Sequence, residues 1–170
     1  MNMKFISHRG NLTGKGPHEN HPDQIKLCVD QGYEVEIDVW AINDKFFLGH
    51  DSAQYPIDFM FLCNTPGLWI HCKNVEALRI CKLPYYNLNC FSIDKDDFVL
   101  TSRGNIWLSP TYQEFYKQSI CVMPEDTRWH FSKEQLADFD GICSDNIYHY
   151  KNYVTNLRRR RSTHGRKEVL

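Results

Sequence analysis

The stretch YEVEIDVW, residues 33–40, alternates apolar and acidic side chains. Because successive side chains of a β-strand point to opposite faces, this stretch predicts a strand with one apolar face and one acidic face. Glu36 and Asp38 are two residues apart on the acidic face, which separates them by about 7 Å along the strand. Carboxylate oxygens placed in this way suit a divalent metal ion. The alternative interpretation is an ordinary solvent-exposed strand face.

Strand and helix patterns alternate on both sides of this stretch. A short apolar run over residues 4–7 ends at His8, a helix begins at Asp23, and residues 42–51 form a hairpin partner for the central strand. Alternation of strands with short helices is typical of α/β proteins with a mainly parallel sheet. The remaining predicted elements are strands over residues 68–73, 89–93, 98–102, 105–108, 120–123 and 141–143 and helices over residues 75–82 and 132–138.

The length of 170 residues fits one domain. We expect this domain to occupy residues 1–150. Residues 151–170 form a basic C-terminal helix or tail, which contains four consecutive arginines at 158–161. A run of four cations at the end of a chain is predicted to extend into solvent.

Composition excludes several classes of partner. A formal net charge of -1 gives no whole-molecule attraction to nucleic acid, so no nucleic-acid partner is expected. The longest apolar runs, such as residues 59–63, are far shorter than the roughly 20 residues of a transmembrane helix, and no apolar signal core begins the chain. Seven cysteines without close pairing predict buried free thiols in a reducing compartment, and hence a cytoplasmic location.

Two His-containing pairs stand at the ends of predicted strands. His8-Arg9 follows the first strand, and His50-Asp51 follows the hairpin partner. Imidazole titrates near neutral pH, so two histidines can supply one base and one acid. The planar guanidinium of arginine suits phosphate. A histidine taken alone is more often a surface bystander, so the signal lies in the set.

The order of these motifs resembles that of a known family. His8-Arg9-Gly10, Glu19-Asn20, Glu36-Ile-Asp38, His50-Asp51 and Lys73 are similar to motifs of the glycerophosphodiester phosphodiesterase family, in the phosphatidylinositol-phospholipase-like TIM-barrel group. A TIM barrel typically needs about 250 residues. The resemblance therefore implies that residues 1–150 form a reduced TIM-like (β/α) barrel with several helices shortened or missing.

The resemblance also implies a function, the metal-assisted hydrolysis of a small phosphodiester. His8 and His50 would be the acid/base pair. Arg9 and Lys73 would bind the phosphate. Glu36 and Asp38 would bind a divalent metal, Ca or Mg. Glu19, Asn20 and Asp51 would support the site.

His71 departs from the family pattern. It stands two residues before Lys73, where the family usually has an acidic metal ligand. A neutral imidazole can replace a carboxylate, but it shifts the metal preference away from Ca and Mg towards softer ions. His71 is therefore a candidate third ligand, and the identity of the metal stays open.

Two other functions remain open from the sequence. One is a lyase of the phospholipase or sphingomyelinase-D type, which forms a cyclic phosphate. The other is a degenerate barrel that binds a phosphorylated ligand without turnover. No oligomeric state is predicted.

Overall fold

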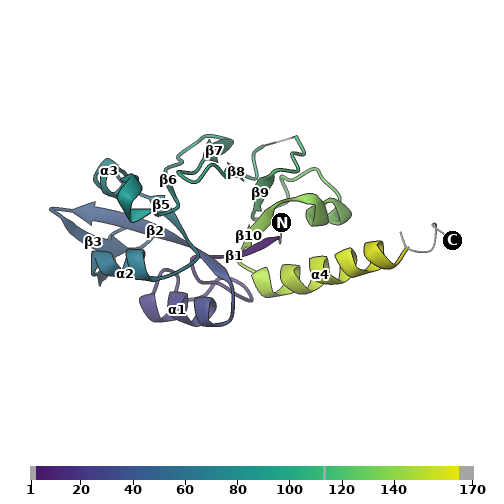
Figure 1. The fold of residues 1–170 in the computed structure, drawn as a ribbon, viewed down its shortest axis with the longest axis horizontal. Coiled ribbons are helices and arrows are strands. Elements are labelled where there is room, and N and C mark those ends of the chain that lie inside the picture. Colours follow the sequence, from purple (N-terminus) through teal and green to yellow (C-terminus); the bar gives the residue numbers. More distant parts are fainter. Residues whose placement is uncertain (1–2, 113, 165–170) are drawn as a thin grey trace.

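A computed structural model describes residues 3–112 and 114–164 as a mixed α/β fold built around one curled sheet. Figure 1 shows helices α1, α2 and α4 along the lower side of this sheet, with β6, β7 and β8 at the opposite side of the view. The elements, in chain order, are β1 (Lys4–His8), α1 (Pro22–Asp30), β2 (Glu34–Ile42), β3 (Lys45–Leu48), β4 (Tyr55–Ile57), α2 (Phe59–Asn64), β5 (Leu68–Cys72), α3 (Val75–Cys81), the 3-10 helix η1 (Pro84–Tyr86), β6 (Cys90–Phe91), β7 (Phe98–Leu100), β8 (Ile106–Leu108), β9 (Ser119–Val122), the 3-10 helix η2 (Lys133–Asp138), β10 (Gly141–Ser144) and α4 (Ile147–His164).

The sheet has ten strands within the described residues. Its main path runs β6-β5-β2-β1-β10-β9-β8-β7, and the antiparallel pair β3-β4 branches from β2. Every pairing from β6 to β8 along this path is parallel, whereas β7 is antiparallel to β8. No ladder joins β6 to β8 in the part of the chain that the structure describes, so the sheet is an open half-barrel.

The expected reduced TIM-like barrel is therefore wrong. The sheet is mixed and open, and the fold is rich in strands rather than helices. The segment between β6 and β8 contains the short strand β7 in place of a helix. Its Asp94, Asp96 and Asp97 are typical turn residues, which disfavour a helix interior. Antiparallel pairing of β2 with β3 and of β3 with β4 also makes the sheet mixed.

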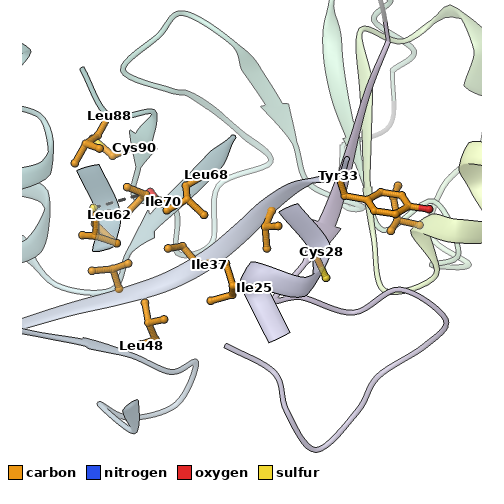
Figure 2. Close-up of a cluster of buried hydrophobic side chains, with 14 of the residues drawn as sticks. Ile25, Cys28, Tyr33, Ile37, Leu48, Leu62, Leu68, Ile70, Leu88 and Cys90 are labelled. Atoms are coloured by element: carbon orange, nitrogen blue, oxygen red, sulfur yellow. Dashed lines mark hydrogen bonds between the residues drawn. The ribbon is translucent and has the colours of Figure 1, made fainter. Parts of the chain in front are cut away.

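The main hydrophobic core lies between one face of the sheet and the four α-helices. Figure 2 shows Ile37 of β2 and Ile70 of β5 close to Leu48, Leu62 and Ile25. All five side chains are almost completely buried. The seven cysteines are free and all except Cys63 are buried, which confirms the prediction of buried free thiols for six of them.

A second hydrophobic cluster covers the other face of the sheet, which we call the inner face. Its members are Ile6, Trp69, Phe91, Trp107, Ile120, Val122 and Cys143. Four of these residues are followed, two positions later at the carboxyl end of their strand, by a polar side chain: His8, His71, Ser109 and Asp145. Because side chains two apart share a face, an apolar layer of the inner face is followed by a polar layer.

The basic C-terminal segment is not free in solvent where the structure describes it. Helix α4 extends from Ile147 to His164, and Arg158 donates hydrogen bonds to the carbonyls of Ala137 and Phe139. Arg161 pairs with Asp138 at 2.8 Å. The predicted solvent-extended arginine run is therefore wrong for these two arginines. None of the described helices, α4 included, combines the length and apolar character needed to cross a membrane.

Candidate functional site

The polar layer of the inner face forms where β1 and β5 flank β2. Parallel pairing places His8 opposite Glu36 and His71 opposite Asp38. The carboxyl ends of neighbouring parallel strands meet at one edge of a sheet, so groups on three strands converge there. Glu36 is 3% exposed and Asp38 is fully buried. The solvent-exposed interpretation of this acidic face is therefore wrong.

Glu36, Asp38 and His71 form a compact cluster whose potential ligand atoms all lie within 4.8 Å of one another. The Nδ1 atom of His71 lies 3.0 Å from Asp38 Oδ1 and 4.0 Å from Glu36 Oε1. Two ligand atoms that bind one ion at about 2.1 Å each are about 3–4 Å apart. The spacing of the three groups thus fits a single divalent ion.

A hydrogen bond shows which ring nitrogen of His71 carries a proton. Its Nε2 lies 3.1 Å from the carbonyl oxygen of Ile93, which can only accept, so Nε2 carries a proton. Nδ1 of the neutral ring then directs a lone pair toward Asp38. Asp38 Oδ1 is buried and, among the described residues, has no assigned hydrogen-bond partner. Two facing lone pairs at 3.0 Å call for a shared cation, either a proton on Nδ1 or a metal ion.

Asp38 is held in its charged form by its surroundings. Its Oδ2 lies 3.1 Å from Arg9 Nε and accepts a hydrogen bond from Asn20 Nδ2, while Lys73 Nζ lies 3.5 Å from Oδ1. Burial raises the pKa of Asp38, but His71, when its Nδ1 carries a proton, and the charge of Arg9 outweigh burial and bring the pKa well below its usual range. The carboxylate is ready to bind a cation without losing a proton.

The pKa of Glu36 is shifted in the opposite direction, above its usual value. Burial raises its pKa, and the negative charge of neighbouring Asp38 raises it further. A cation placed between the two carboxylates would relieve both effects. The donor set therefore fits a metal ion, with two carboxylates and one imidazole as ligands.

His8 is oriented by a residue at the far end of the chain. Its Nδ1 lies 2.7 Å from Asp145 Oδ1, and its Nε2 lies 3.8 Å from Glu36 Oε2. Burial lowers the pKa of His8, but the hydrogen bond with Asp145 and the charge of Glu36 outweigh burial and raise the pKa above its usual value. Because the carboxylate accepts from Nδ1–H, Nε2 is the ring atom available for proton transfer.

These groups border a cavity of about 170 Å³. Four of its lining residues carry ionisable side chains close to the cluster: His8, Arg9, Glu36 and His71. The rest of the lining is mainly apolar and consists of Phe91, Ile93, Asp94, Trp107, Ser109, Pro110 and Val122. The cavity therefore offers both charged groups and apolar surface to a small ligand.

Most of the predicted site residues come together here. Besides the residues already placed, Glu19 accepts a hydrogen bond from Arg9 Nη1, and Asn20 bonds both the side chain and the backbone amide of Asp38. Both therefore contact residues of the predicted site, Glu19 through Arg9 and Asn20 through Asp38.

The structure does not bring His50 and Asp51 into this cavity. His50 is partly exposed, and its Nδ1 lies 2.7 Å from Asp51, which is almost fully exposed. The residue before His50 is nevertheless close to the site, because the Gly49 amide donates to the Asp38 carbonyl at 3.1 Å. His50 therefore stands at the rim, outside the residues that line the cavity.

Sequence reasoning assigned no role to Asp145 or Asn11. Asp145 orients His8, and Asn11 hydrogen bonds Asp145 from within the loop after β1. A signal for Asp145 existed, because it directly follows strand β10, while His8 is the last residue of β1, so both stand at the carboxyl end of a strand. No comparable signal marked Asn11, since asparagine is common in loops.

Removal of the Asn20 side chain is expected to destabilise the fold. Asn20→Ala deletes two hydrogen bonds to a buried aspartate, and the expected loss in the free energy of unfolding is about 2–4 kcal/mol. Asn43→Ala is the matched control, because Asn43 is exposed and has a similar positive φ, 53° against 61°. Urea unfolding of both variants measures the difference, and equal losses would contradict the role given to Asn20.

Comparisons with protein-family models, with curated proteins and with solved structures found no match to this chain. The functional assignment therefore depends on the geometry of the described residues.

Proposed function

We propose that this protein is a metal-assisted phosphodiester hydrolase that acts on a small phosphodiester of the glycerophosphodiester type. The observation that supports this proposal most strongly is the cluster of Glu36, Asp38 and His71, two of which, Glu36 and His71, line one cavity together with His8 and Arg9. The resemblance of the sequence motifs to glycerophosphodiester phosphodiesterases points to the same chemistry.

Glu36, Asp38 and His71 would hold the divalent ion. When bound, such an ion supplies positive charge that polarises a phosphoryl oxygen and offsets the charge of the transition state. The imidazole favours Mn²⁺ or Zn²⁺ over the Ca²⁺ or Mg²⁺ of an all-carboxylate site.

Arg9 and Lys73 would bind the phosphate. Each contacts Asp38, so both cations are already positioned beside the metal ligands. A bound divalent ion would add positive charge beside these two cations. Positive charge at this position suits a phosphodiester and its more negative transition state.

His8 would move the proton. Its Nδ1 is held by Asp145, so Nε2 can accept a proton from the attacking nucleophile. The attack bonds a fifth oxygen to phosphorus, and departure of an alkoxide, protonated as an alcohol, leaves a phosphomonoester when water is the nucleophile. His50 stays a predicted second acid–base group, located at the rim.

One observation favours a second candidate function. Because His50 does not line the cavity, only one histidine is positioned for proton transfer. A protein that binds a phosphorylated ligand without turnover would have the same charged groups. We propose a cytoplasmic location for either function, with the free cysteines as support.

Turnover is the direct test. We expect hydrolysis of bis(p-nitrophenyl) phosphate and of glycerophosphodiesters in the presence of Mn²⁺ or Zn²⁺, followed by release of nitrophenol and by phosphorus NMR. His8→Ala should lower kcat by about 100-fold or more, because general acid–base catalysis contributes at least that factor. His130→Ala is the matched control, since this histidine is exposed.

The outcomes separate the candidates. Phosphorus NMR distinguishes a phosphomonoester from a cyclic phosphate, which would indicate the lyase. Absence of turnover with every metal, in a folded protein that binds glycerol phosphate, would replace the hydrolase with the binding protein.

The metal preference tests the role of His71. His71→Asp restores an all-carboxylate site, and we expect the affinity for Mg²⁺ relative to Mn²⁺ to rise about tenfold or more. Calorimetric titration of both metals measures this ratio. An unchanged ratio would exclude His71 as a ligand.

A further inference from the structure

Asn11 is a buried asparagine in the loop that follows β1, and it is 5% exposed. Its backbone amide donates to the carbonyl of His8 at 2.9 Å, and its carbonyl accepts from the hydroxyl of Ser7 at 2.8 Å. Its side-chain Oδ1 accepts from the amide of Gly16 at 3.2 Å. The residue is therefore fixed at its backbone and at its side chain.

The amide nitrogen of Asn11 joins two carboxylates. Nδ2 donates to Glu19 Oε1 at 2.7 Å and to Asp145 Oδ1 at 2.8 Å. Carboxylates accept and a backbone amide donates, so the contacts with Glu19, Asp145 and Gly16 define the orientation of the side chain. Both hydrogens of Nδ2 are used.

Each of these carboxylates holds a residue that the proposed reaction needs. Asp145 Oδ1 also contacts His8 Nδ1 at 2.7 Å, and Glu19 Oε2 accepts from Arg9 Nη1 at 3.3 Å. One neutral side chain thus connects the support of the proton-transfer histidine with the support of the phosphate-binding arginine.

We propose that Asn11 is a positioning residue that fixes the geometry of His8 and Arg9 together. It touches neither the cavity nor the metal ligands, and it acts through the two carboxylates it bridges. As a neutral donor, Asn11 holds two negative groups in place without neutralising either one. The inference rests on the proposed function for its kinetic consequence, while its structural consequence is independent of turnover.

The experiment compares wild-type protein with Asn11→Ala and Asn11→Asp. Asn11→Asp keeps the side-chain volume and the acceptor for Gly16 but replaces the shared donor with a third carboxylate. With bis(p-nitrophenyl) phosphate and Mn²⁺, both variants should lower kcat about 10- to 100-fold through His8 and raise KM through Arg9. Asn152→Ala, an exposed asparagine of α4, is the matched control.

A second readout does not need activity. Nitrogen-15 NMR of the imidazole in the intact, metal-free chain should show the proton of neutral His8 on Nδ1 in the wild type. In both Asn11 variants it should show a mixture of Nδ1–H and Nε2–H forms. Unfolding midpoints of the same samples report whether the variants are folded.

The outcomes decide between the alternatives. Kinetic constants within about twofold of wild type and an unchanged His8 tautomer in folded variants would overturn the positioning role, whereas the hydrolase would stand. No turnover by wild-type protein would overturn the proposed function, and the tautomer measurement would still decide the role of Asn11. Unfolding of both variants would assign Asn11 to fold stability alone and would also overturn the proposal.

Discussion

The site depends on one buried carboxylate, Asp38. A charge without exposure to water is costly unless it is paired and hydrogen bonded. Asp38 meets this requirement at Oδ2 through Asn20 and Arg9, while His71 and Lys73 lie beside Oδ1. The surroundings of this charge therefore bring together the cations proposed to bind phosphate and a candidate metal ligand.

The sheet makes this convergence possible. Strand β2 pairs with β1 and β5 in parallel and with β3 in the antiparallel direction, so three strand ends surround its acidic positions. The period of two places the apolar side chains of β2 in the main core and leaves Glu36 and Asp38 on the inner face. The polar layer is then supported by the apolar cluster of the inner face.

Local patterns predicted part of the site, and long-range contacts determined the rest. Strand alternation identified Glu36 and Asp38 as candidate ligands, and the family resemblance added His71, two residues before Lys73, as a third candidate. The position of His50 depends on the turn at Gly49, whose φ of 145° only glycine adopts readily, and on the adjacent Asp51. The link between His8 and Asp145 joins residues 137 positions apart, which no local pattern encodes. The open sheet was missed because β7 occupies the segment where a closed barrel would need a helix and another parallel strand.

Anomalous diffraction from a crystal grown with Mn²⁺ would show whether Glu36, Asp38 and His71 bind one divalent metal ion, as proposed. We expect a single strong anomalous peak about 2.1 Å from a carboxylate oxygen of Glu36, Oδ1 of Asp38 and Nδ1 of His71. A well-ordered site without such a peak, with His71 still within hydrogen-bonding distance of Asp38, would exclude this metal site. The shared cation would then be a proton on the histidine.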